Sequence, residues 1–237
     1  MKRFYKSVAV AERPEGWLVE LDGRPVRTPD RSPLATPHRA LAEAVAAEWD
    51  AQTEKVDPAA MPLTRHLNTA IDRVAPQRRH VIDELLSYGG SDLVCYRAEA
   101  PMELISRQHA AWGPLLDWLE ARYGARLVVT EGISHVAQSA ETLGRLGEGL
   151  AEYDDVALAA LHTVTTIAGS LVIAMALAGG RLDLEGAWAA ANVDEAFQIE
   201  RWGEDTEAAA RAARLRAELA SAARVLDLCL GRGGAGA

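Results

Sequence analysis

Six carboxylates lie close together near the C-terminal end of this sequence, and their spacing is its clearest indication of chemistry. They occur in the segment VDEAFQIERWGEDTE, residues 193–207, which also contains a Phe and a Trp. Grouped carboxylates can act as general acid and base, bind a metal ion, or pair with basic groups on a partner protein. An ordinary solvated helix is the fourth interpretation.

Half of this cluster has a structural explanation. The residues after Gly203 are expected to open a new helix, because glycine there should change the direction of the chain. Acidic side chains in a first turn face the positive end of the helix dipole and stabilise it. The residues concerned are Glu204, Asp205 and Glu207, the last of which is spaced to pair with Arg211.

Glu195 is harder to explain as a solvated residue. When residues 184–202 are projected as one helix at about 100° per residue, Glu195 falls in the middle of an apolar stripe. Burying an unpaired carboxylate costs several kcal/mol, so it needs a partner, a shifted pKa or access to solvent. Arg97 and Arg107 are the expected partners. The stripe consists of Leu184, Trp188, Ala191, Ile199 and Trp202.

The opposite side of the same projected helix is apolar and acidic. Val193, Phe197 and Glu200 lie there, and Asp194 lies on the flank between the two faces. A helix with two such faces is either internal or presents one of them to a partner.

Other candidate sites are weaker. Cys95 is a possible nucleophile with a distant His as base, although a buried cysteine is more often a small apolar side chain. The segment DGRPVRTP carries two arginines that could grip a phosphate or carboxylate, but an edge strand blunted by Pro and charge is favoured. The six histidines lack metal-ligand spacing, and neither GxSxG nor HExxH occurs. The enzyme alternative is therefore a hydrolase with Glu195 as general base and Cys95 or a bound water as nucleophile.

Composition limits the possible partners. With 237 residues, 49% of them apolar, the chain can bury enough surface to fold, and a net charge of -9 with a pI near 5.2 disfavours nucleic acid and anionic membranes. Cys95 and Cys229 lie far apart, which indicates free thiols in a reducing compartment. Residues 161–180 are uncharged, but Thr, Ser, Gly and Ala dilute them, so a central buried helix is favoured over a membrane span.

The elements that position these residues indicate an α+β fold. A small β-rich domain is predicted over residues 1–75, a larger mainly α-helical domain over 76–230, and a flexible tail over 231–237. In the first domain, Asp22-Gly23 predicts a hairpin, and a helix from Thr36-Pro37 to Gln52 carries Leu41, Val45 and Trp49 on one face. In the second, ARLVVTEG is a strand that could extend the N-terminal sheet, and the last helix is expected from 204 to 230.

Five fragments in the same order carry a resemblance to a known family. They are DGRPVRTPDRSPLATP, AEWDAQTEKVDPAAMPLTRHLNTAIDRV, YGGSDLVCYRAEAP, RQHAAWGPLLDWLEARYGARLVVTEGI and DEAFQIERWGEDTEA. Together they resemble the assembly chaperones that bind the α subunit of the catalytic head of F-type ATP synthase. The resemblance runs from residue 2 to residue 230. It implies a two-domain protein without catalytic activity or cofactor, whose partner is the free α subunit.

The resemblance also implies site residues. DEAFQIERWG looks like the acidic docking region of the family, which makes Asp194 and Glu195 the docking carboxylates. Phe197, Glu200 and Trp202 are candidate partner-binding residues beside them. AEWDAQ contributes Trp49 as a further characteristic position, although its place beside Leu41 and Val45 predicts that a change there mainly damages folding.

The same resemblance gives an expected setting. No mitochondrial presequence precedes the first strand, and the Ala- and Arg-rich composition is typical of bacteria, so a bacterial cytoplasmic protein is expected, with eukaryotic relatives in the mitochondrial matrix. A monomer is expected. A purely structural scaffold is the third hypothesis, beside the chaperone and the hydrolase.

Overall fold

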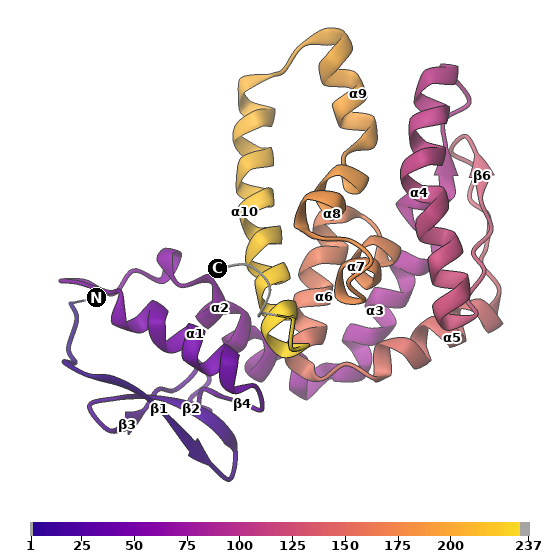
Figure 1. The fold of residues 1–237 in the computed structure, drawn as a ribbon. Helices are drawn as coiled ribbons and strands as arrows, with labels where there is room; N and C mark the ends of the chain where they lie inside the picture. Colours follow the sequence, from indigo (N-terminus) through magenta and orange to yellow (C-terminus); the bar gives the residue numbers. More distant parts are fainter. Residues whose placement is uncertain (1, 233–237) are drawn as a thin grey trace. The chain divides into compact units, whose positions relative to one another are not determined.

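The computed structural model describes residues 2–232 and divides the chain into two compact units (Figure 1). Within the described residues, one unit contains 2–78, 154–160 and 224–232, and the other contains 79–153 and 161–223. Most of the predicted tail, residues 233–237, lies outside the described residues. The first unit therefore takes in two segments from the C-terminal two thirds of the chain.

The first unit contains a four-stranded sheet built around a hairpin. β1 (Val8–Arg13) pairs antiparallel with β2 (Gly16–Leu21). The other side of β2 pairs with β3 (Arg24–Pro25) and with β4 (Ala35–Thr36). Asp22 and Gly23 make the predicted turn with φ of 48° and 76°, the left-handed conformation of two-residue hairpin loops. Among the described residues β3 pairs with no strand other than β2, which confirms the edge-strand interpretation of DGRPVRTP.

The first helix, α1 (Arg39–Asp50), begins three residues after its predicted N-cap, Thr36. Thr36 is paired with Trp17 in the sheet, so the chain is still extended at that point. Leu41 and Val45 are fully buried, as the predicted face requires. Short helical segments follow α1 in the first unit. They are η1 (Pro58–Ala60), α2 (Pro62–Thr69), η2 (Ala70–Val74) and η3 (Ala75–Gln77).

Two carboxylates join later parts of the chain to this unit. Asp154 accepts a hydrogen bond from Nε2 of His38 at 2.5 Å, and Asp155 forms a 2.8 Å ion pair with Arg78. These contacts explain why residues 154–160 group with the N-terminal sheet rather than with the rest of their helix.

The second unit is almost entirely helical. Three helices, α3, α6 and α10, contribute residues to both units. Pro114 lies inside α4, which is assigned as one helix along its whole length. The elements are α3 (Arg78–Gly90), η4 (Leu93–Cys95), β5 (Tyr96–Arg97), α4 (Met102–Tyr123), β6 (Thr130–Glu131), α5 (Ala140–Ala151), α6 (Asp155–Ala168), α7 (Leu171–Ala178), α8 (Leu184–Ala191), α9 (Val193–Trp202) and α10 (Thr206–Cys229).

The strand predicted within ARLVVTEG forms, but it does not extend the N-terminal sheet. β6 pairs in parallel with β5 in a separate two-stranded sheet of the second unit. It is short because the side-chain amide of Gln138 accepts from the backbone N–H of Val128 at 2.8 Å and donates to its carbonyl at 3.0 Å. That amide occupies the groups that a neighbouring strand would have used.

The predicted single helix over residues 161–180 is two helices. α6 ends at Ala168, Gly169 adopts a left-handed φ of 63°, and the hydroxyl of Ser170 caps α7 by accepting from the N–H of Ile173 at 3.0 Å. Every residue of α7 is buried, as expected for a helix that is apolar on all sides. Among the described residues, no helix is long and apolar enough to cross a membrane.

A buried carboxylate fixes this break. Asp92 is fully buried and accepts hydrogen bonds from the N–H groups of Val94 at 3.2 Å and Val172 at 3.0 Å. It therefore caps both η4 and the first turn of α7. Burial raises the pKa of Asp92 to about 6, against the opposing effect of its hydrogen bonds from Ser170 and the backbone.

Candidate functional site

The helix predicted over residues 184–202 is divided into two helices. α8 and α9 are separate helices that meet at Asn192, whose φ and ψ are -118° and 26°. The side chain of Asn192 donates to the carbonyl of Trp188 at 2.8 Å. The projected stripe nevertheless stays on one side of α9, where Glu195 and Trp202 line the same pocket. Phe197 is buried at 3% exposure, whereas Trp202 is 76% exposed.

The strip that contains Phe197 and Glu200 packs against α4. The guanidinium carbons of Arg107 and Arg201 lie 5.3 and 4.5 Å from the centroid of the Phe197 ring. Arg107 pairs with Glu200 at 2.7 Å and with Glu103 at 2.9 Å, and Arg201 pairs with Glu103 at 2.7 Å. Hydrogen bonds from these arginines lower the pKa of Glu103 and Glu200. This network holds α9 on α4.

Asp194 also contacts α4, through a hydrogen bond instead of an ion pair. Its Oδ1 accepts a hydrogen bond from Nε2 of Gln108 at 2.7 Å, and the Oε1 of that amide accepts from the N–H of Ala98 at 2.8 Å. Gln108 is 2% exposed. Sequence reasoning missed Gln108, because a glutamine inside an apolar stripe gives no signal that separates a buried hydrogen-bonding group from a surface residue.

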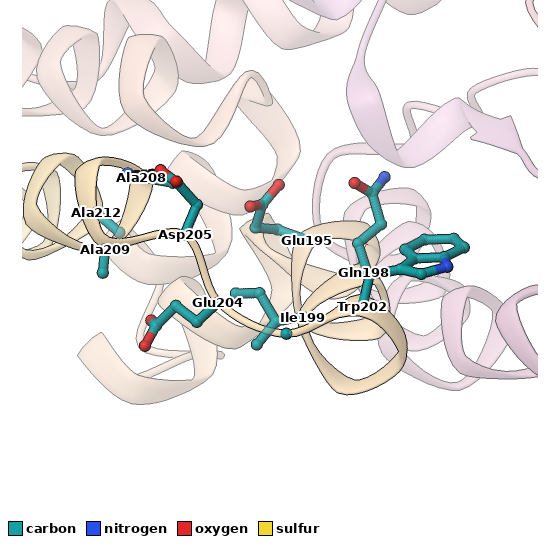
Figure 2. Close-up of a pocket in the computed structure, with 10 residues that line it drawn as sticks. Glu195, Gln198, Ile199, Trp202, Glu204, Asp205, Ala208, Ala209 and Ala212 are labelled. Carbon is teal, nitrogen blue, oxygen red and sulfur yellow. Dashed lines mark hydrogen bonds between the residues drawn. The ribbon is translucent and has the colours of Figure 1, made fainter.

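A cleft between α9 and α10 presents the remaining predicted residues (Figure 2). The helices are joined by a link of three residues that starts at Gly203 and ends at Asp205, whose carboxylate accepts from the N–H of Ala208 at 2.8 Å and caps α10. We refer to this feature as the α9–α10 cleft. It is lined by Glu195, Gln198, Ile199, Trp202, Gly203, Glu204, Asp205, Ala208, Ala209 and Ala212.

The α9–α10 cleft exposes apolar surface rimmed by carboxylates. Ile199 is 36% exposed and Trp202 is 76% exposed. The α10 side contributes only alanines beyond the link, so no long side chain fills the space. Their spacing, at positions 208, 209 and 212, was the signal in the sequence for a small-residue helix face.

Glu195 stands at this cleft without a partner in the described residues. No hydrogen bond or ion pair to its carboxylate forms within residues 2–232, and the predicted pairing with Arg97 or Arg107 is wrong. Arg107 is occupied by Glu103 and Glu200, and Arg97 by the carbonyl of Gln108. The anomaly that the projection assigned to Glu195 is resolved by exposure to solvent.

The hydrolase alternative loses Cys95 as its nucleophile. Cys95 is 1% exposed, and burial raises the pKa of its thiol to about 12, so it stays protonated. It does not line the cleft. Among the described residues, no three His, Cys, Asp or Glu side chains are grouped so that they could hold a metal ion.

Trp49 belongs to the other unit. Its ring contacts Tyr5 at 5.8 Å between centroids, and the Tyr5 hydroxyl donates to the Trp49 carbonyl at 2.6 Å. The indole Nε1 is buried and has no hydrogen-bond partner among the described residues. Through these contacts with Tyr5, Trp49 holds the N-terminal segment against α1.

A cleft with exposed apolar side chains and a carboxylate rim is suited to binding a macromolecule. A family model described as ATP12 chaperone protein matches residues 2–120. The chain belongs to the ATP12 chaperone family. Atp12 from Paracoccus denitrificans, a solved structure, is 44% identical with a TM-score of 0.93, and the match covers 96% of this chain and 98% of that one.

Two further proteins are similar to this chain over most of its length. The solved structure of the Atu1473 protein from Agrobacterium tumefaciens is 46% identical with a TM-score of 0.91, covering 97% of this chain and 86% of that one. The mitochondrial protein atp12 of Schizosaccharomyces pombe is 27% identical, covering 85% of this chain and 74% of its own length. These matches confirm the resemblance to the ATP synthase assembly chaperones and the α+β fold class. The ATP12 family model ends before α9 begins.

Proposed function

We propose that this protein is a chaperone that binds the free α subunit of the ATP synthase catalytic head and shields its subunit interface until assembly. It works as a monomer in the bacterial cytoplasm, without cofactor or catalytic turnover. Membership of the ATP12 family supports this function, and the α9–α10 cleft supplies a surface for it. Exposure of Trp202 and Ile199 beside the unpaired Glu195 is the observation that carries the proposal.

The physical basis is the cost of exposing an interface. A free α subunit displays apolar surface that it later buries against its neighbours, and such patches drive aggregation. Burying Trp202 against this surface would contribute roughly 3–5 kcal/mol before the cost of association is subtracted. A contact of this size holds the client, yet the larger native interface can displace it.

The carboxylate rim adds selectivity to the apolar contact. Glu195 and Glu204 line the cleft with Asp205, so basic groups on the client would find favourable partners and acidic ones would be repelled. Asp194, Glu195 and Trp202 are the proposed docking residues. Phe197 and Glu200 hold α9 in place through their contacts with Arg107.

The test is suppression of aggregation of isolated α subunit by equimolar protein without nucleotide, followed by light scattering. We expect suppression by the natural protein and its loss in Trp202→Ser, whose thermal midpoint should be unchanged because the ring is mostly in solvent. Trp188→Phe on α8 is the matched aromatic control. Equal suppression by natural protein and Trp202→Ser, or a strict requirement for ATP, would contradict the proposal.

A further inference from the structure

A second pocket opens in the same unit as the α9–α10 cleft, and its lining includes an arginine as well as two carboxylates. Arg97 from β5, Gln108 from α4 and Asp194 from α9 line it, with Glu99 and Ile133 from the loops that follow β5 and β6. Ile133 is 99% exposed. We refer to this feature as the Arg97 pocket.

Arg97 is buried without a carboxylate partner. It is 3% exposed, and its Nη1 donates a long 3.3 Å hydrogen bond to the carbonyl of Gln108. Its Nε has no acceptor in the described residues, and none of their carboxylates lies within the 4.0 Å of an ion pair. Burial lowers the pKa of Arg97. A buried charge left in this state costs several kcal/mol, so an external acceptor would stabilise it.

The contact with Trp112 does not replace such an acceptor. The guanidinium carbon lies 4.9 Å from the Trp112 ring centroid, and the indole N–H is already bonded to the carbonyl of Ala190 at 2.8 Å. A ring face offers no lone pair to an N–H in the guanidinium plane. The stacked ring instead holds the plane fixed, which favours a planar acceptor.

The surroundings select the kind of anion. Asp194 and Glu99 on the pocket wall repel anions, and they repel a phosphate with nearly two charges more than a carboxylate with one. A carboxylate also matches the planar fork of a guanidinium. The exposed Ile133 adds an apolar contact that a free inorganic ion would not use.

We propose that the Arg97 pocket binds the carboxylate of an Asp or Glu side chain on the client protein, with Arg97 as the anion-binding group and Ile133 as the apolar contact beside it. The source of the carboxylate rests on the proposed chaperone function, whereas the chemistry of the pocket does not. The client would then carry a basic group for the α9–α10 cleft and an acidic group for the Arg97 pocket, which fixes its orientation on α9.

Nuclear magnetic resonance of the natural protein tests the pocket itself. We expect N-acetyl-glutamate amide to shift the Arg97 Nε–H signal saturably at millimolar concentrations, and N-acetyl-glutamine amide to leave it unchanged. The two probes differ in charge and share their shape. Absence of a saturable shift with the acidic probe, or an equal or larger effect of inorganic phosphate, overturns the carboxylate assignment.

Binding of the α subunit tests whether the carboxylate in the pocket comes from the client protein. Ile133→Ser should weaken binding of the isolated α subunit about tenfold without changing the thermal midpoint, because the side chain is almost wholly in solvent. Val128→Ser, two residues before β6, 48% exposed and outside the pocket, is the control. Unchanged affinity in Ile133→Ser overturns the client assignment. If the α subunit fails to bind the natural protein while the acidic probe still shifts Arg97, the proposed function fails and the carboxylate pocket stands.

Discussion

Gln108 donates a hydrogen bond from its Nε2 to Oδ1 of Asp194 at 2.7 Å, and this contact ties the first turn of α9 to the middle of α4. The same side chain accepts from the N–H of Ala98. One buried amide thus sets the position of a proposed docking carboxylate and of the strand that carries Arg97.

Replacing Gln108 by Leu should destabilise the protein by about 1–3 kcal/mol, because the N–H of Ala98 and the carboxylate of Asp194 both lose their partner. Urea unfolding followed by circular dichroism measures this. Gln198→Leu is the matched control, since Gln198 is exposed on α9. Equal stability of the two variants would show that the buried amide contributes nothing to the free energy of unfolding.

The sequence predicts elements well where local chemistry decides them. The Asp22-Gly23 hairpin forms because both positions need positive φ, which these residues tolerate. Leu41 and Val45 are buried as expected because they lie within one unbroken helix. In such places the local pattern and the tertiary packing agree.

Prediction fails where a break depends on tertiary contacts. Asn192 separates α8 from α9 with neither Pro nor Gly beside it, so the break was not expected from the sequence. The projection placed Trp202 and Phe197 on opposite faces but left open which face is buried, and the packing of Phe197 against α4 decides it. The Gly169-Ser170 break has a local signal, but Asp92, distant in sequence, completes it.

Glu195→Gln should leave the free energy of unfolding within about 0.5 kcal/mol of the natural value, because the carboxylate has no partner in the described residues. Affinity for the α subunit should fall about tenfold, the loss expected for a charged contact across an interface. Titration calorimetry and urea unfolding of the same samples give both quantities. Glu195→Lys should abolish binding.

Two further variants control for general charge effects. Glu148→Lys on α5 makes the same reversal at another exposed position and should not alter binding. Glu200→Gln removes a carboxylate five residues after Glu195, yet should act mainly through a small loss of stability because it breaks the pair with Arg107. Unchanged affinity in both Glu195 variants would remove this residue from the docking surface.

Asp92 should make stability fall as pH rises. Its folded-state pKa is raised to about 6 from an ordinary value of 3.8, so the folded form binds the proton more tightly than the unfolded chain between these values. The contribution is complete below about pH 4 and is lost as pH rises through 6, by about 3 kcal/mol. Asp92→Asn lacks this dependence. The stability difference between natural protein and variant should therefore be larger at pH 4 than at pH 7, and a difference independent of pH would contradict it.

His66 should make stability fall as pH decreases, the opposite of the effect of Asp92. Burial, aided by Arg65, lowers its pKa from 6.5 to about 4, so below pH 6.5 the unfolded chain takes up a proton that the folded form refuses. Stability from this group is present above pH 6.5 and is lost as pH falls to 4, by about 3 kcal/mol. His66→Gln should flatten this acid loss in urea unfolding series. An identical acid slope in the variant would assign the loss to other groups.

Trp49→Arg should damage folding of the first unit. The substitution removes the ring contact with Tyr5 and places a second guanidinium near Arg3, which already lies 4.6 Å above the Tyr5 ring and pairs with Asp50. A loss of about 2–3 kcal/mol is expected, seen as a lower thermal midpoint and a lower soluble yield. Trp49→Phe keeps the apolar ring and removes an indole N–H that has no partner among the described residues, so its stability should stay close to the natural value. If Trp49→Arg were as stable as Trp49→Phe and failed only to bind the α subunit, Trp49 would belong to the docking surface instead of the fold.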